Sequence, residues 1–374
     1  MNPDDAALRD QARRILEAHW VPEGYAAPND RVYPWQWLWD SCFHALIWAE
    51  LGDHDRALCE LATALSVQDD ESGFVPHMNY VRDPGFHADF WGRRGASSIT
   101  QPPMYGHVVA ELRRRGVPVP DELEHRARRG VEFLLRRRRR DERGMVLLAH
   151  PWETGCDDSP RWDDVCGGEF DLSRWYDRKG ELVASLELDA SGAPIGNREM
   201  TVASAGFNAL VAFNAAELGL DADDVVDALD ARWDADRVTW VDSGQTERGS
   251  GRFRTVDGLL PTLVTRDAAA RTAAFASLLD PRAHGATFGP TGVHRAEPTF
   301  SPSVYWRGPT WPQLSYLLWV AASRAGDGAT ASAIAASTRA GASRSGFAEY
   351  WNPDTGAGLG AIPQSWTGVA ILVR

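Results

Sequence analysis

The chain has 374 residues, of which 44% are hydrophobic, and a formal net charge of −13 at pH 7. This length favours two domains or one large ring-shaped domain, and the acidic charge disfavours nucleic acids and anionic membranes as partners. No apolar run approaches the length of a membrane span, and the acidic, amphipathic start of the sequence predicts neither a signal peptide nor an anchor.

Four segments share one helical pattern. In each, an Ala- and Leu-rich helix ends at a glycine, and an acidic residue follows shortly before a second such helix. Glycine readily adopts the left-handed conformation that ends a helix, and an aspartate can cap the first amides of the next one. Each segment therefore predicts a helical hairpin with a short turn. The hairpins cover residues 44–65, 108–135, 208–229 and 317–338.

Three further helices are expected, at 6–19, at 266–279 and from Ser365 onward. About a dozen helices in repeated hairpins can bury their apolar faces by packing side by side into a closed ring. The segment 177–197 alternates weakly and contains the turn signal DASG, which predicts a small β-hairpin. Because no stretch resembles a linker, we expect one domain over residues 1–374.

The connections between the hairpins are rich in Trp, Tyr, Pro, Gly, Asp and Asn, and the chain has 16 tryptophans. Long connections with this many aromatic residues are typical of functional loops. Aromatic rings are common platforms for the apolar faces of sugars. We expect the loops to gather at one mouth of the ring and form a pocket. They comprise residues 24–40, 68–103, 150–197 and 298–311.

The first of these loops ends in YPWQWLWDSCFHA, where three tryptophans alternate before Asp40. One interpretation is structural: Asp40 and Ser41 cap a helix that begins near Cys42, and the tryptophans pack. The other is functional: Asp40 accepts hydrogen bonds from sugar hydroxyls while Trp39 stacks beneath the ring. Further on, Gln101 precedes a predicted helix and can offer both a donor and an acceptor to a diol.

The stretch HPWETGCDDSPRWDD, from His150 to Asp164, places acids among aromatic rings. Its proline and small residues predict a loop for Asp157 and Asp158, beside Trp152. A carboxyl held against aromatic rings loses hydration, which raises its pKa and keeps it protonated near neutral pH. Cleavage of a glycosidic bond requires such a protonated acid. The alternative is a calcium loop, but the acids lack the alternate-residue spacing of an EF-hand.

Two clusters nearer the C-terminus add to the expected pocket. Tyr305, Trp306 and Arg307 stand just before a strongly apolar helix. Glu349 lies in an aromatic setting before a glycine-rich loop, where an isolated acid is costly to bury, and is a candidate second carboxylate. The sequence contains no phosphate-binding glycine loop, no GxSxG or HExxH motif and no Cys/His zinc spacing, so no metal site is predicted.

The chain resembles glycoside hydrolase family 63, and especially its bacterial glucosylglycerate and mannosylglycerate hydrolase branch. The resemblance lies in the motifs YPWQWLWDSCFHA, GFVPHMNY, ITQPP, HPWETGCDDSPRWD, YWRGPTWPQLSYLLW and EYWNPDTGAGLG. It implies an all-α fold, the (α/α)6 toroid, and hydrolysis that inverts the anomeric configuration. It also implies Asp157 as general acid and Glu349 as the general base that activates water.

The resemblance further implies sugar-binding positions, with Tyr80 and Gln364 on the leaving-group side. The other positions are Tyr33, Trp39, Asp40, Gln101, Tyr305, Trp306, Gly308 and Trp311. Trp152 and Arg307, from the loops described above, complete the expected binding set. Asp158 stands where the family usually has Asn, so an alternative is that Asp158 shares or takes the acid role. The region 163–197 is expected to be a short, cap-like insertion, unlike the glycerate-specific form.

We therefore expect an inverting glycoside hydrolase that cleaves a short α-linked glucoside or mannoside, such as glucosylglycerate, mannosylglycerate or a disaccharide. Two alternatives stay open. One is a non-catalytic sugar-binding protein, and the other is a sugar epimerase on the same toroid that uses histidines. The candidate histidines are His44, His77, His107 and His150. The expected partner is a small-molecule sugar; neither a cofactor nor a metal is required, and the oligomeric state is left open.

An anionic leaving group such as glycerate requires a local cation. The candidates are Arg93, Arg94, Arg198, Arg252 and Arg307. The one lysine of the chain, Lys179, accompanies 38 arginines, a bias that indicates codon usage rather than function. The four scattered cysteines indicate reduced thiols, and hence a cytoplasmic protein.

Overall fold

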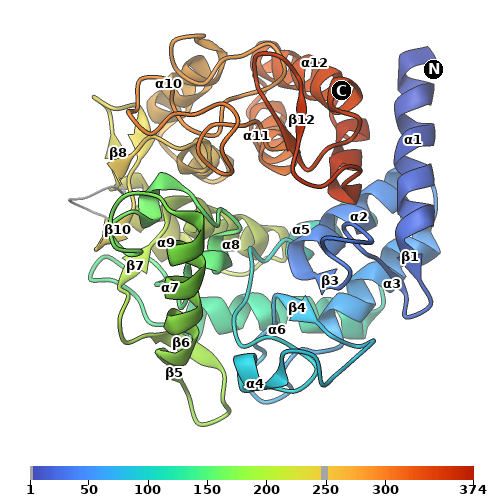
Figure 1. Ribbon diagram of the computed structural model, residues 1–374, viewed down its shortest axis with the longest axis vertical. Helices are drawn as coiled ribbons and strands as arrows, with labels where there is room; N and C mark the ends of the chain where they lie inside the picture. Colours follow the sequence, from blue (N-terminus) through green and yellow to red (C-terminus); the bar gives the residue numbers. More distant parts are fainter. Residues whose placement is uncertain (1–2, 246–251) are drawn as a thin grey trace.

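A computed structural model describes residues 3–245 and 252–374 of the chain. In this part of the chain, six helical elements form an inner ring, in which each contacts the next and the last contacts the first (Figure 1). In order they are α2 (Leu38–Glu50), α5 (Tyr105–Arg114), α8 (Ala205–Glu217), η4 (Val256–Leu263), α11 (Pro312–Arg324) and η5 (Ser365–Ile371). The ring is therefore closed.

A second layer of helices packs on the outside of this ring. Its members are α1 (Pro3–His19) on η5, α3 (His54–Leu65) on α2, α6 (Asp121–Arg136) on α5, α9 (Asp223–Asp230) on α8, α10 (Ala268–Leu279) on η4 and α12 (Gly328–Ser345) on α11. The inner helix α8 is buried from Ala205 to Ala215 and is apolar nearly all round, whereas the outer helices α1, α3, α6 and α9 expose charged side chains and α10 and α12 expose mainly small ones. The expected all-α (α/α)6 toroid is confirmed.

The four predicted hairpins are confirmed as α2–α3, α5–α6, α8–α9 and α11–α12. Gly52 ends the first hairpin's inner helix with a left-handed φ of +83°. Asp53 and Asp327 cap the following helices as expected, accepting bonds from backbone amides. The other two hairpins differ, because Pro120 and Ala222 hold the N-cap position there and no side chain caps the helix.

Two other local predictions need correction. The helix expected near Cys42 begins at Leu38, so Asp40 lies in its first turn and does not cap it. The cap position belongs to Trp37, whose side chain makes no capping bond. The last element, expected from Ser365, is a 3-10 helix, η5.

The strands of the described residues form six two-stranded antiparallel sheets. They pair β1 (Trp20–Val21) with β2 (Tyr25–Ala26), β3 (Gln36–Trp37) with β4 (Met78–Asn79), β5 (Leu186–Leu188) with β6 (Pro194–Asn197), β7 (Val202–Ala203) with β10 (Ser243–Gly244), β8 (Trp233–Asp234) with β9 (Thr239–Trp240), and β11 (Tyr350–Trp351) with β12 (Gly358–Leu359). The predicted β-hairpin is confirmed as β5–β6, but residues 177–184 belong to a helix, α7 (Leu172–Ala184).

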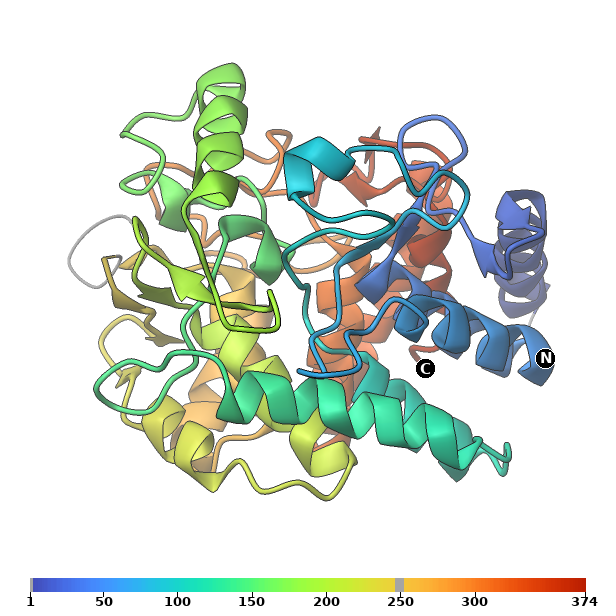
Figure 2. The same ribbon diagram turned by 90° about the horizontal axis from the view of Figure 1, so that it is seen from below.

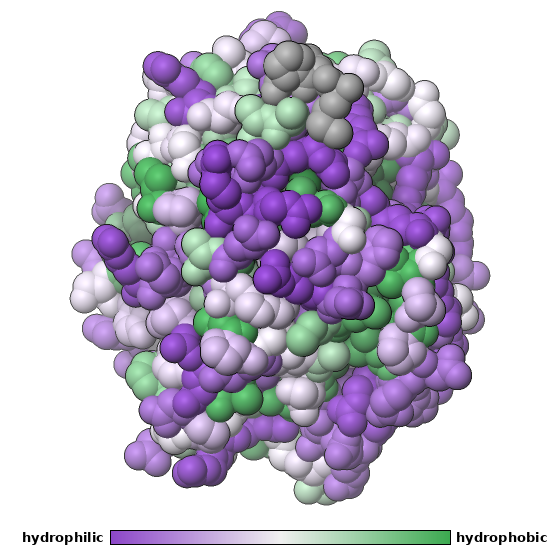
Figure 3. Space-filling view, turned by 90° about the vertical axis from the view of Figure 1, so that its right-hand side faces the viewer, coloured by the Kyte–Doolittle hydropathy of each residue, from purple (hydrophilic) through white to green (hydrophobic). Residues whose placement is uncertain are grey.

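Short helices lie in the connections: α4 (Ala88–Trp91), η1 (Pro151–Thr154) and η2 (Pro160–Trp162). In Figure 2, α4 and α7 stand at the same edge of the molecule, on the side opposite α6. The face that carries α1 is largely hydrophilic, with hydrophobic residues gathered in small patches (Figure 3). Within residues 3–245 and 252–374, no helix is both long and apolar enough to cross a membrane.

Candidate active site

A pocket lies where the long connections meet. Its wall combines aromatic rings with three carboxyls and two glutamines. The lining residues are Tyr33, Trp37, Trp39, Asp40, Gln101, Gly155, Asp157, Tyr305, Trp306, Glu349, Gln364 and Trp366. The structure thus brings together most of the residues that the sequence predicted for one site.

Glu349 is fixed at the end of the loop that follows α12. Its Oε1 accepts a hydrogen bond from the Tyr33 hydroxyl at 3.0 Å, and its Oε2 accepts one from the backbone amide of Ala361 at 2.9 Å. The indole of Trp366 donates to the backbone oxygen of Glu349 at 3.0 Å. Burial raises the pKa of Glu349 to about 7, while the bonds from Ala361 and Tyr33 act in the opposite direction because they stabilise the charged form.

Asp157 lies in the turn between η1 and η2, where the sequence predicted a loop. Burial raises its pKa to about 7. The positive charge of Lys179 lowers the pKa, whereas the negative charges of Asp158 and Glu349 raise it. The hydroxyl of Tyr305 donates to Oδ2 at 3.5 Å. A carboxyl in these surroundings holds a proton near neutral pH.

The two carboxyls are held differently. Glu349 accepts bonds from two donors within 3.0 Å, and these favour its ionised form. Asp157 has the longer bond from Tyr305 and faces other carboxylates. When one proton is shared between the two groups, these contacts favour Asp157 as its holder. The pair is therefore suited to act as an acid and a base.

Asp40 is the third carboxyl of the wall and is buried. Burial, reinforced by the charge of Glu349, raises its pKa well above the ordinary value. Beside it, the backbone amide of Trp39 donates to Oε1 of Gln101 at 3.3 Å, which orients the Gln101 amide.

Asp158 turns to a different partner, because its carboxylate forms a buried ion pair with Lys179 of α7. Of the two adjacent acids, Asp157 is the one that lines the pocket. Asp163, in the same acid-rich stretch, pairs with Arg307 at 2.7 Å. The acids of the stretch therefore diverge, and the described residues contain no group of three His, Cys, Asp or Glu side chains that could hold a metal ion.

Stacked aromatic rings support one wall. The rings of Trp306 and Trp311 are parallel within 6° at a centroid distance of 3.6 Å, and Tyr350 stacks on Trp311 at 4.5 Å. Trp306 lines the pocket, and Trp311, which was predicted to bind sugar, lies behind it. On another wall, Gly155 approaches Trp39 so closely that a Cβ atom would lie 2.5 Å from the indole.

The structure places Tyr80 and Trp152 in a neighbouring hydrophobic cluster rather than in the pocket lining. The Tyr80 hydroxyl accepts a hydrogen bond from the indole of Trp91 at 2.9 Å. Trp152 lies edge-on to Trp91 and 6.0 Å from the ring of Tyr176 on α7. These side chains join the segment after β4 to α4, η1 and α7 beside the pocket.

Arg307 and Gly308 also have neighbours other than the pocket. The Arg307 guanidinium pairs with Asp163 and lies over the ring of Phe170 at 4.5 Å. Gly308 packs against backbone, because a Cβ atom there would lie 2.5 Å from the carbonyl oxygen of Ser301. Arg307 and Gly308 therefore hold the loop that carries Tyr305 against Asp163, Phe170 and Ser301.

Three lining residues were not predicted: Trp37, Gly155 and Trp366. The alternation of Trp37 with Trp39 in the sequence was a signal for the first, because residues two apart in an extended segment share a face, although Trp39 lies in the first turn of α2. Gly155 lies two residues before Asp157, and Trp366 two residues after Gln364, but nothing in the local sequence separates these residues from others nearby.

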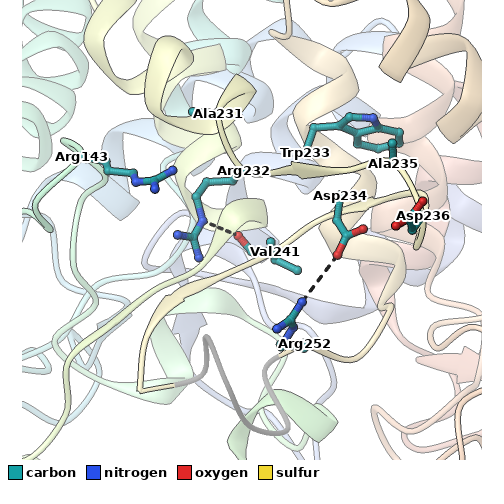
Figure 4. A pocket seen from close by; sticks show the side chains of 9 residues that line it. All are labelled: Arg143, Ala231, Arg232, Trp233, Asp234, Ala235, Asp236, Val241 and Arg252. Atoms are coloured by element: carbon teal, nitrogen blue, oxygen red, sulfur yellow. Dashed lines mark hydrogen bonds and ion pairs between the residues drawn. The ribbon is translucent and has the colours of Figure 1, made fainter.

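The candidate cations lie elsewhere. Arg252 lines a different, more open pocket of about 790 Å³, where it faces Asp234 at 3.7 Å (Figure 4). Arg93 lies over the ring of Phe74, and Arg198 donates to backbone carbonyls at the end of α7. Arg94 is exposed. Among the described residues that line the pocket of Asp157 there is no arginine or lysine.

The four histidines of the epimerase alternative are buried in the scaffold. Their partners are Glu60 for His44, Ser97 for His77, Tyr316 for His107 and the backbone oxygen of Lys179 for His150. Burial lowers the pKa of His77 to about 3 and that of His150 to about 4. The described lining of the pocket includes none of the four.

Comparison with known proteins gives a consistent result. The mannosylglycerate hydrolase of Thermus thermophilus is 29% identical over 93% of this chain and 96% of its own length. The glucosylglycerate hydrolase of Mycolicibacterium hassiacum is 29% identical over 91% of this chain and 92% of its own. A crystal structure of a GH63 mannosylglycerate hydrolase from Thermus thermophilus, in complex with Tris and D-glycerate, has a TM-score of 0.80 at 25% identity, over 98% of this chain and 100% of that one.

The sequence model of the mannosylglycerate hydrolase MGH1-like glycoside hydrolase domain matches residues 33–367, which is most of the chain. The match spans the inner ring from α2 to α11 and every residue that lines the pocket of Asp157. The chain therefore belongs to the MGH1-like glycoside hydrolase family, close to the bacterial branch of glycoside hydrolase family 63, and is a glycoside hydrolase.

Proposed function

We propose that this protein hydrolyses a short α-linked glucoside or mannoside with inversion, using Asp157 as general acid and Glu349 as general base. The observation that carries the proposal is that both carboxyls line one pocket, each with its pKa raised to about 7, while only Glu349 accepts two close hydrogen bonds. A protonated acid facing an ionised base is the arrangement that inverting hydrolysis requires.

In the proposed reaction, Asp157 gives its proton to the glycosidic oxygen as the bond to the anomeric carbon breaks. A water molecule attacks that carbon from the opposite face and passes its proton to Glu349, so an α-glycoside yields the β-sugar and the free alcohol. The carboxyl groups must leave room for this water and hence lie roughly 6.5 to 9.5 Å apart. The mechanism uses no metal and no cofactor.

The proposed substrate class comes from the relatives and from the pocket. The relatives are named for mannosylglycerate and glucosylglycerate, and one solved structure holds glucose. Within the described structure, three buried polar atoms of the lining have no hydrogen-bond partner: Nε1 of Trp37, Nε1 of Trp306 and Oε1 of Gln364. Sugar hydroxyls can satisfy such atoms, which supports a sugar ring in this pocket.

Tyr33, Trp39, Asp40, Gln101, Tyr305, Trp306 and Gln364 are proposed to hold this sugar. We propose that residues 163–197 serve as a short cap beside the leaving group within one catalytic domain. The leaving group is glycerate or a second neutral sugar. With no arginine or lysine among the described lining residues, a substrate panel needs both charged and neutral leaving groups. A cytoplasmic location fits the four free cysteines.

The test is hydrolysis of glucosylglycerate, mannosylglycerate, trehalose, kojibiose and nigerose, with the anomer of the released sugar followed by proton NMR. Asp157→Ala and Glu349→Ala separate the two roles when an α-glycosyl fluoride is added to the panel, because fluoride leaves without a proton. The acid variant should lose about 10² to 10⁴-fold on the natural bond and much less on the fluoride. The base variant should lose activity on both.

Release of the α-anomer would overturn the inverting mechanism. Full activity in either variant would overturn the assignment of that residue. Binding without hydrolysis across the panel would favour the sugar-binding alternative, and return of an epimer would favour the epimerase, although none of the four candidate histidines lines the pocket.

A further inference from the structure

Lys179 is the only lysine of the chain, and arginine fills the 38 other basic positions. Its side chain is buried, with an exposed fraction of 3%. Nζ donates to the backbone oxygen of Asp157 at 2.7 Å and to the carboxylate of Asp158 in a shorter contact. One ammonium group from α7 therefore binds both adjacent acids of the catalytic loop.

A second contact joins α7 to the same loop. The backbone oxygen of Lys179 accepts a hydrogen bond from Nε2 of His150 at 2.8 Å, and Nδ1 of His150 accepts one from the amide of Trp152. Because a carbonyl oxygen can only accept, the Nε2 atom of His150 carries the proton. The opposite face of α7 is exposed at Asp177 and Glu181, which lie two residues before and after Lys179. The helix thus meets the loop along the face that carries Lys179.

Negatively charged groups outnumber positively charged ones around the Asp157 carboxyl. The carboxyls that act on it are Asp158, Glu349 and Asp40, and Lys179 is the cation that acts on it most strongly. The phenols of Tyr33 and Tyr305 and the thiol of Cys156 are the neutral titratable groups beside it. Lys179 itself faces the His150 imidazole and the Cys166 thiol.

We propose that Lys179 is a positioning residue that couples α7 to the catalytic acid, holding the backbone of Asp157 while neutralising Asp158. This inference rests on the proposed role of Asp157 as the acid. A substrate or partner that displaces α7 would withdraw Lys179 and leave Asp158 unpaired beside the acid. Residues 172–184 thereby acquire a direct influence on proton donation.

The chemistry of the site explains why a lysine stands here in a chain that otherwise uses arginine. An ammonium is a compact point charge whose three protons can point in different directions, whereas a guanidinium donates in a fixed plane. The two acceptors, a backbone oxygen and the next residue's carboxylate, meet at a single atom. Arginine carries the charge but not this convergent geometry.

The test is the pH dependence of kcat/KM in the full chain on whichever glycoside of the panel it cleaves. The basic limb of this profile, the fall in kcat/KM at high pH, reports the loss of the proton from Asp157. Lys179→Met leaves the Asp158 charge uncompensated, so the basic limb should move to higher pH by roughly one unit. Asp158→Asn leaves Lys179 unpaired, so the limb should move to lower pH by a similar amount. The double variant should return it close to the wild-type position.

Lys179→Arg separates charge from geometry. It should restore the basic limb toward its wild-type position, while kcat stays reduced by 10-fold or more because the bond to the Asp157 backbone is lost, a reduction of roughly 1.4 kcal/mol of transition-state stabilisation. Arg178→Met is the matched control, since the neighbouring Arg178 is partly exposed and pairs with Glu181 and Glu199. It should change neither limb nor kcat.

The inference is overturned if Lys179→Met and Asp158→Asn both leave the basic limb at its wild-type pH, or if both shift it in the same direction. If Lys179→Met does not fold, Asp158→Asn and the double variant still decide between these outcomes. Failure of the proposed function is distinguishable, because Asp157→Ala would then retain activity. If Asp157→Ala is inactive but neither Lys179→Met nor Asp158→Asn shifts the basic limb, only the inference about Lys179 is refuted.

Discussion

The Tyr33 hydroxyl donates a hydrogen bond to Oε1 of Glu349 at 3.0 Å, across 316 residues of sequence. The bond joins the loop before α2 to the loop after α12, the two segments that meet where the ring closes. It stabilises the ionised carboxylate that the proposed base requires. The closure of the toroid and the state of the base are therefore linked in one contact.

Tyr33→Phe should move the acidic limb of kcat/KM to higher pH. Burial raises the pKa of Glu349 and the Tyr33 bond lowers it, so loss of the bond lets the pKa rise and the base becomes protonated at higher pH. A hydrogen bond to a charged group is worth about 1.5 to 3 kcal/mol, so activity at neutral pH should fall by roughly 10 to 100-fold. An unchanged acidic limb would contradict this account of Glu349.

The wild-type profile of kcat/KM should be bell-shaped with its maximum near neutral pH. Burial raises the pKa of both Asp157 and Glu349 to about 7, and the two titrate as a coupled pair. Activity should fall at low pH as Glu349 gains a proton, and at high pH as Asp157 loses one. Rates measured over a wide pH range would refute the pairing if they stayed flat on either side.

Gly360→Ala should lower kcat strongly. Gly360 has a left-handed φ of +69°, and a Cβ atom there would collide with Oε2 of Glu349. Gly192→Ala is the matched control, because Gly192 has a φ of +80° but open space around it. Both variants carry the backbone penalty of about 1 kcal/mol, and only the first displaces the base. Equal kcat values in the two variants would contradict the prediction.

Arg161→Met should destabilise the fold. Arg161 lies after the catalytic turn and pairs with Asp257 at 2.5 Å and Asp242 at 3.2 Å, all three buried. Removing the cation takes away the closest positive charge from two buried carboxylates, a change expected to lower the free energy of unfolding by about 3 to 5 kcal/mol. Urea unfolding measures it, and Arg282→Met, which removes an exposed pair with Asp280, should cause little change.

The helical hairpins were predictable because their signals are local. Apolar periodicity, a glycine at Gly52 and an aspartate at Asp53 lie within a few residues of the structure they specify. The helix start at Leu38 was missed for the converse reason. Trp37 holds the cap position without a capping bond, and the amide of Leu38 instead bonds to the carbonyl of His77 in another loop.

The amino-acid sequence by itself determined the fold class, the loops that carry the site and the three carboxyls that line it, Asp40, Asp157 and Glu349. Only the tertiary structure decided that Asp158 pairs with Lys179, that Arg307 pairs with Asp163, and that Trp366 joins the pocket wall. The physical reason is the range of the interactions. Helix and turn signals act within a few residues, whereas the partner of a buried charge is fixed by packing between segments far apart in the chain, which no local pattern contains.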